Sequence, residues 1–335
     1  MYKTIFFRIP LLFLLLTGLP LAGIISTNQD ISGYLEFPPQ TYFISHAAFS
    51  WPLFFFFALV EIAAVVFICI LLIETRQKYK HRRPKSTPQG SFPWWGILSL
   101  FIVAIFWWLS WTRYELFADY QKYTYIPLWF GFIILLNALI KRRLGSCPLT
   151  ANPRIYLLLF PCSSLFWWYF EYLNRFTQNW QYAGTDIFGP VGYGIYATLC
   201  FSTVLPAIAA VCKLLYTYNL FNSDLIVGHR ISILQPRLYA FIALLFSCTG
   251  LFLLGIFPNW FFPLLWIAPL LLLSAWLVLE GRPLIFGTVR NGDWRTIITP
   301  ALSALICGFF WEMWNFRSFA HWEYSLPFVE RFKIF

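Results

Sequence analysis

The chain has 335 residues, of which 59% are hydrophobic, 22% are aromatic and only 11% are charged, and its formal net charge is +10. Soluble domains contain about 45–50% apolar and about 25% charged residues, so a water-soluble fold has no place for this much apolar surface. The composition predicts an all-helical protein that crosses a membrane many times. It excludes a disordered chain, a disulfide-rich scaffold and a nucleic-acid-binding domain.

Nine segments of the sequence are apolar enough to be spans, because about 20 apolar residues cross the hydrocarbon core as a helix. In chain order they are 5–25, 51–73, 93–111, 125–140, 155–173, 191–216, 238–258, 261–280 and 298–316. The sequence therefore predicts a single transmembrane domain over residues 1–335, a polytopic bundle of about nine spans built from repeated two-helix hairpins. In this scheme, residues 1–92 form an N-terminal hairpin and a basic cytoplasmic loop, and residues 93–335 form the repeat-containing bundle.

The basic residues indicate the orientation of the bundle, because Lys and Arg accumulate in the cytoplasmic loops of membrane proteins. With the N-terminus in the cytoplasm, most Lys and Arg residues fall in the predicted inner loops, above all in 74–92. We therefore expect the N-terminus inside and the C-terminus outside. Residues 1–25 also have the basic start and apolar stretch of a signal peptide. A retained helix is the interpretation we prefer, and cleavage stays open.

Familiar catalytic and cofactor motifs are missing from the sequence. It contains no P-loop, no HExxH zinc motif and no nucleophile elbow. None of its four histidines lies in the middle of a predicted span, which excludes a pair of intramembrane haems and argues against a metal centre. We expect neither a metal ion nor an organic cofactor.

Two segments share an arrangement of aromatic, acidic and amide residues, in which Glu-x-x-Asn at the end of a span is followed by Trp-x-Tyr. The first constellation comprises Trp168, Glu171, Asn174, Trp180 and Tyr182, and the second comprises Trp311, Glu312, Asn315, Trp322 and Tyr324. Both lie at the predicted outer ends of spans that run from inside to outside. The recurrence predicts an internal repeat.

The chemistry of the repeat has two interpretations. Residues three apart on a helix share a face, so Glu171 lies beside Asn174 and Glu312 beside Asn315. A carboxyl group among aromatic rings near the membrane surface is suited to donate a proton. Alternatively, each Glu only holds the following turn in place, and Arg175 is spaced to neutralise Glu171. We expect both Glu-Asn pairs to face one interior cavity that opens towards the outer leaflet.

Glu61 is an isolated carboxyl near the middle of the second predicted span, with Ala58 and Ala64 three residues away on either side. An ionisable group at this depth is costly and points to a function. The alternative is a hydrogen bond from a protonated Glu61 to a neighbouring helix. The small neighbours predict that this face packs against another helix.

The segment from Tyr125 to Ser146, together with the two constellations, resembles uncharacterised polytopic inner-membrane proteins of bacteria. The resemblance covers about residues 105–185 and 305–325. It implies a multi-pass protein of the bacterial inner (cytoplasmic) membrane. It brings no established activity and no catalytic residues.

Three classes of function fit the sequence. The first is a structural or accessory membrane subunit with an aromatic and carboxylate site near the outer leaflet. The second is a membrane enzyme that acts on a polyprenyl or lipid-linked substrate by acid catalysis, with Glu61, Glu171 and Glu312 as candidate acids. The third is a proton-coupled transporter or flippase. Membrane lipids are the expected partners in all three, other membrane subunits are expected in the first, and nucleic acid is excluded.

Overall fold

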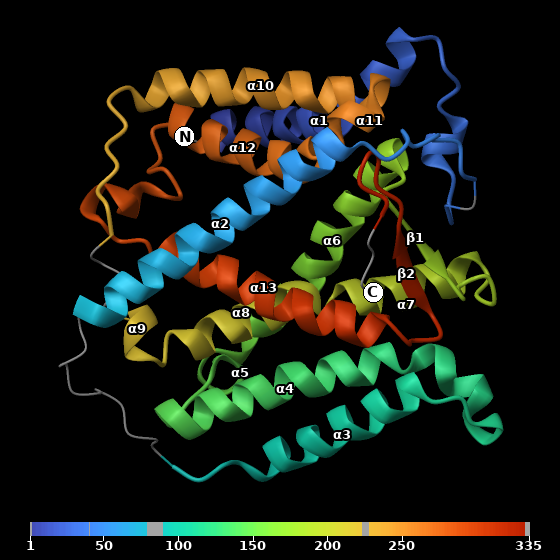
Figure 1. The fold of residues 1–335 in the computed structure, drawn as a ribbon, viewed down its shortest axis with the longest axis vertical. Helices are drawn as coiled ribbons and strands as arrows, with labels where there is room; N and C mark the ends of the chain where they lie inside the picture. Colours follow the sequence, from blue (N-terminus) through green and yellow to red (C-terminus); the bar gives the residue numbers. More distant parts are fainter. Residues whose placement is uncertain (1, 40, 79–89, 223–227, 332–335) are drawn as a thin grey trace.

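The structure, a computed structural model, describes residues 2–39, 41–78, 90–222 and 228–331 and is mostly helical (Figure 1). The α-helices of these residues are α1 (Tyr2–Ser26), α2 (Trp51–Lys78), α3 (Trp94–Trp111), α4 (Tyr125–Leu144), α5 (Pro148–Ala151), α6 (Pro153–Thr177), α7 (Pro190–Phe201), α8 (Val204–Leu215), α9 (Asn219–Asn222), α10 (Pro236–Ile256), α11 (Pro258–Phe261), α12 (Leu264–Leu279) and α13 (Arg295–Asn315). Shorter 3-10 helices are η1 (Ser32–Leu35), η2 (Glu115–Tyr123) and η4 (Gly287–Asn291), and the two strands are β1 (Trp180–Ala183) and β2 (His321–Tyr324).

Six helical segments in the described part of the chain are long and apolar enough to cross a membrane. They are Trp51–Gln77, Trp94–Trp111, Tyr125–Leu144, Pro190–Leu215, Pro236–Ile256 and Arg295–Asn315. Two shorter apolar helices, Pro10–Ser26 and Leu264–Leu279, coincide with two further predicted spans. Helix α6 coincides with the fifth predicted span, 155–173, but is not among the six. The helices indicate a membrane protein, while the count of nine spans stays a prediction.

Proline and glycine mark the ends of several helices. Pro153, Pro190 and Pro236 stand in the first turn of α6, α7 and α10, where a helix needs no backbone N–H donor. Helix α4 ends at Gly145, whose φ of 76° lies in the left-handed region that glycine adopts without strain. Three basic residues in the last turn of α4 complement the negative end of the helix dipole.

Helix α6 connects the two main cores of the molecule. Its N-terminal half contributes Tyr156 to a core with α3, α4, α8 and α13, in which Trp129 and Trp314 are fully buried. Its C-terminal half contributes Phe170 and Leu173 to a second core with α1, α10 and α12. Figure 1 shows α6 running between these two groups of helices. The C-terminal end of α6 is therefore fixed by neighbours from both groups.

The helix pairs agree only in part with the predicted series of hairpins. Helix α3 packs against α4, and α10 packs against α12, as consecutive hairpins should. Among the described residues, however, α1 packs mainly against α10, and α2 contacts α9. This arrangement differs from the predicted N-terminal hairpin of residues 1–92. Most of the basic loop predicted at 74–92 lies outside the described residues.

Candidate functional site

The two constellations meet in the two-stranded sheet. Strand β1 follows α6, strand β2 follows α13, and the strands pair antiparallel, side by side in Figure 1. In this register Trp180 lies opposite Tyr324, and Tyr182 lies opposite Trp322. Residues two apart in a strand project from the same face, so the Trp-x-Tyr spacing puts all four rings on one side of the sheet.

Each constellation uses its asparagine to tie a strand to the end of a helix. The Asn174 side-chain amide donates to the Trp180 carbonyl oxygen (2.8 Å), and its Oδ1 accepts from the Asn179 backbone N–H (2.8 Å). The Asn315 amide likewise donates to the Trp322 carbonyl oxygen (2.8 Å), and its Oδ1 accepts from the Trp322 N–H (2.8 Å). Both asparagines are buried and bond to backbone groups. They position the strands.

Glu171 is buried behind the rings of the first constellation. Its Oε1 accepts three hydrogen bonds, from Tyr182 Oη (2.6 Å), Trp180 Nε1 (2.9 Å) and Trp167 Nε1 (3.1 Å). Only 7% of the residue is exposed. Each of the three donors is a side chain that this carboxylate holds in place.

Glu312 has the same tyrosine partner but fewer donors. Its Oε1 accepts a hydrogen bond from Tyr324 Oη (2.8 Å), and this hydroxyl accepts one from Trp322 Nε1 (3.0 Å). The position four residues before Glu312 is Gly308, whereas Trp167 stands four residues before Glu171. The second constellation therefore lacks the indole donor of the first. Glu312 is also half-buried, so it is more accessible than Glu171.

One cavity of about 140 Å³ lies between the two constellations. Most of its lining side chains are aromatic, and Glu312 is the only carboxylate among the described residues that line it. The predicted site residues in the lining are Trp180, Tyr182, Trp311, Glu312, Trp322 and Tyr324. The lining does not include Glu171, Asn174 or Asn315. Glu171 instead accepts hydrogen bonds from two lining side chains, Trp180 and Tyr182.

The sequence analysis misplaced one tryptophan and missed several lining residues. Trp168 does not line the cavity; its Nε1 donates to Thr198 Oγ1 (3.0 Å), and Trp167 takes the expected place. Helix α7 contributes Tyr193, Tyr196 and Cys200 to the lining, and helices α4 and α12 contribute Tyr125 and Trp266. The i, i+3 spacing of the two α7 tyrosines was a signal for a shared face.

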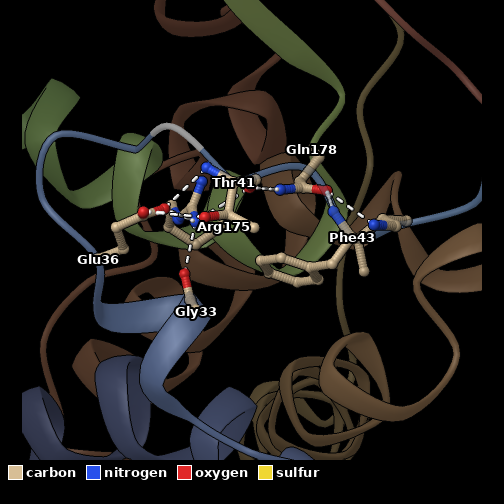
Figure 2. A network of polar contacts seen from close by, with 7 residues as sticks. Gly33, Glu36, Thr41, Phe43, Arg175 and Gln178 are labelled. Atoms are coloured by element: carbon tan, nitrogen blue, oxygen red, sulfur yellow. Dashed lines mark hydrogen bonds and ion pairs between the residues drawn. The ribbon is translucent and has the colours of Figure 1, made fainter.

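The spacing of Arg175 suggested that it pairs with Glu171, but the two side chains form no ion pair in the structure. Its guanidinium turns to the segment after α1, where it forms an ion pair with Glu36 (3.4 Å) and donates to the carbonyl oxygens of Gly33 and Thr41 (Figure 2). Gln178 adds hydrogen bonds to the same segment. This network fastens the segment between α1 and α2 to the end of α6 that carries Glu171.

The carboxylates of the two constellations form no ion pair with a basic side chain in the described part of the chain. Among the described residues, neither Glu171 nor Glu312 takes part in a salt bridge. Burial holds the pKa of Tyr182 and of Tyr324 well above the usual tyrosine value, with a further increase from the neighbouring carboxylates. Both phenols therefore stay protonated at neutral pH and remain hydrogen-bond donors.

Glu61 lies apart from this site. Helix α2 crosses the front of the molecule in Figure 1, and only 6% of its most apolar 18-residue stretch is buried. Glu61 is exposed, as are Ala64 and most of its neighbours, so the predicted packing of this face against another helix is not found within the described chain. Glu61 does not line the cavity.

Neither a metal site nor a known relative indicates the function of this protein. In the described ranges no group of three or more His, Cys, Asp or Glu side chains is placed to hold a metal ion. Comparison of the chain with protein families, with curated proteins and with solved structures finds no match. The fold and the site define a helical membrane protein with an aromatic cavity, and its function has to be argued from that cavity.

Proposed function

We propose that this protein is a nine-span protein of a bacterial inner membrane that binds a small group of a ligand in the cavity between the two constellations. The cavity carries the proposal, because aromatic rings from two distant parts of the chain surround it while a carboxylate reaches its wall. Ligand sites are typically apolar cavities with a few polar groups. A volume of about 140 Å³ is close to the engineered cavity of about 150 Å³ that binds benzene.

The orientation inferred from the basic loops puts this cavity on the outer side of the membrane. The ends of α6 and α13 carry both constellations, and both helices are predicted to run from the cytoplasm outwards. A ligand at this level is either a lipid from the outer leaflet or a solute from the outer compartment. Membrane lipids are thus the expected partners.

A cavity-filling substitution tests ligand binding directly. Ala197 lines the cavity from α7, so Ala197→Phe should fill much of it, and the exposed Ala104→Phe on α3 is the matched control. Each purified protein is extracted with organic solvent, and the extracted molecules are identified by mass spectrometry. We expect a species that is present with the wild type and with Ala104→Phe but absent with Ala197→Phe. The same species from all three proteins would contradict ligand binding in the cavity.

A purely structural role is the second candidate, favoured by one observation. Asn174 and Asn315 bond to strand backbone, and Glu171 accepts three hydrogen bonds from the first constellation, as expected if these groups only hold the sheet. In an accessory subunit of this kind, Glu312 could be exchanged without loss of any bound molecule. The extraction experiment with Glu312→Gln separates the two candidates.

A further inference from the structure

We infer that the ligand group in this cavity is an organic ammonium ion, held by the faces of aromatic rings and by the carboxylate of Glu312. The inference rests on the proposed ligand-binding function and specifies its ligand. It follows from an imbalance of charge. A carboxylate reaches an aromatic cavity, and among the described residues no Lys or Arg lines that cavity.

The Glu312 carboxylate has acceptor positions that a ligand can use. The Glu312 carboxylate accepts a hydrogen bond from Tyr324, whereas Glu171 accepts three, one of them from the tryptophan whose counterpart is Gly308. An ionised carboxylate has about four acceptor positions on its two oxygens. Further donors or a positive charge from a ligand can therefore be accommodated at Glu312.

The nearby basic side chains are directed elsewhere. The Arg317 guanidinium lies over the rings of Trp111 and Phe316, about 6.0 and 5.9 Å from their centroids. His321 lines the cavity, but its Nε2 contacts the carboxylate of Glu323 (3.3 Å). A charge in apolar surroundings is stabilised when it is paired. An ammonium group in the cavity would supply such a charge beside Glu312.

The rings suit an alkylammonium group in both chemistry and size. Tryptophan and tyrosine faces attract cations, and cages of such rings are the usual site for quaternary ammonium ligands. Trp311, Trp322 and Tyr324 line the cavity next to Glu312. A trimethylammonium group has about the bulk of benzene, which fits a cavity of about 140 Å³.

The test compares choline with its neutral isostere 3,3-dimethyl-1-butanol. Binding of each probe is measured by ligand-observed NMR to the full chain in nanodiscs of phosphatidylglycerol, a lipid without an ammonium group. We expect choline to bind, and Glu312→Gln to weaken its binding by about tenfold or more while the alcohol changes less than about twofold. Ala197→Phe should abolish binding of both probes, and Ala104→Phe should affect neither. The amide of Glu312→Gln can still accept from Tyr324, which preserves the fold.

The outcomes separate the inference from the proposed function. If the alcohol binds as tightly as choline and Glu312→Gln acts on both alike, the cavity binds ligands but the ammonium inference is overturned. If neither probe shows binding that the cavity-filling variant removes, both proposals are overturned. Should Ala197→Phe fail to fold, Val204→Phe fills the same cavity from α8.

Two sources could supply the ammonium group, a lipid headgroup or a soluble amine. Repeating the choline titration in phosphatidylcholine nanodiscs distinguishes them. If the lipid headgroup occupies the cavity, the apparent Kd for choline rises by about tenfold or more through competition. An unchanged Kd identifies a soluble ammonium compound as the ligand. Either result supports the ammonium class.

Discussion

Trp180 and Tyr324 lie directly opposite each other in the antiparallel sheet, and the neighbouring pair repeats this relationship with the two residue types exchanged, Tyr182 opposite Trp322. Such reciprocal contacts are what two copies of one unit make when they meet across a twofold axis. The asparagine bonds and the tyrosine-to-glutamate bonds do not cross the sheet but recur within each constellation. The two constellations therefore share one geometry and differ in the hydrogen bonds to their carboxylates, while the internal repeat stays a prediction.

The asparagines should be the most sensitive positions of the sheet. Asn174→Ala removes the acceptor of one backbone N–H and the donor to the Trp180 carbonyl, both in buried positions. An unsatisfied buried polar group costs about 1–3 kcal/mol, so the melting temperature should fall by several degrees. Gln181→Ala, which removes one exposed side-chain contact on the opposite face of β1, is the control and should change stability by less than about 0.5 kcal/mol. Equal effects of the two substitutions would refute the positioning role.

Glu171 should tolerate loss of charge but not loss of its oxygen atoms. Glu171→Gln keeps an acceptor for Trp167, Trp180 and Tyr182, whereas Glu171→Leu leaves all three donors without one. At about 1–3 kcal/mol for each unsatisfied donor, the leucine variant should be destabilised by roughly 3 kcal/mol or more. Thermal unfolding followed by circular dichroism measures both. A glutamine variant as unstable as the leucine variant would show that the charge itself is required.

The local part of this site could be predicted from the sequence, and the long-range part could not. Glu-x-x-Asn and Trp-x-Tyr are short spacings that can be read from the sequence, so the two constellations were predictable. Of the two Glu-Asn pairs expected to face one cavity, only Glu312 lines it. The antiparallel pairing of two four-residue strands depends on how α6 and α13 are placed by the cores, which no local spacing encodes. Trp266 enters the cavity for the same reason. The sequence analysis chose Trp168 instead of Trp167. Neighbouring residues of a helix point about 100° apart, so only one of the two tryptophans can face the cavity.

Asp293 should make the start of α13 sensitive to acid. Its two carboxylate oxygens accept from the Arg295 guanidinium (2.9 and 2.8 Å) and one accepts from the Arg295 backbone N–H (3.1 Å). The hydrogen bonds from Arg295 hold the pKa of Asp293 below its usual value. A lowered folded-state pKa means that the stability from this contact is present above the usual Asp pKa and is lost as the pH falls through the lowered value.

Asp293→Asn should therefore lower stability at neutral pH by roughly 1 kcal/mol, the typical contribution of a charge-assisted contact at a helix start. As the pH falls below the usual Asp pKa of about 3.9 and through the lowered value, the wild type should lose this advantage, because Asp293 becomes protonated. The measurement is the melting temperature of both proteins from pH 7 down to about pH 2, which covers the range below the usual Asp pKa. A difference that stays constant over this range would contradict the assignment.

Reporter fusions test the orientation. The excess of Lys and Arg in the predicted inner loops puts residue 85 in the cytoplasm and residue 335 outside. Fusions of alkaline phosphatase, active only outside, and of green fluorescent protein, fluorescent only inside, should give opposite signals at these two positions. The same signal at both positions would mean that the number of spans between them is even, whereas the predicted spans give an odd number.

Glu61 gives a prediction about the isolated chain. No described residue forms a polar contact with its carboxyl group, and the side chain is exposed near the middle of an apolar helix. A charged residue at this depth costs about 2.5–3.5 kcal/mol on the insertion scale, a cost that leucine does not carry. Glu61→Leu should therefore keep or raise the melting temperature of the protein in nanodiscs, and Glu61→Gln should be nearly silent. A fall of several degrees for the leucine variant would show that Glu61 has a bonding partner within the chain, and this helix would then pack more closely than the structure describes.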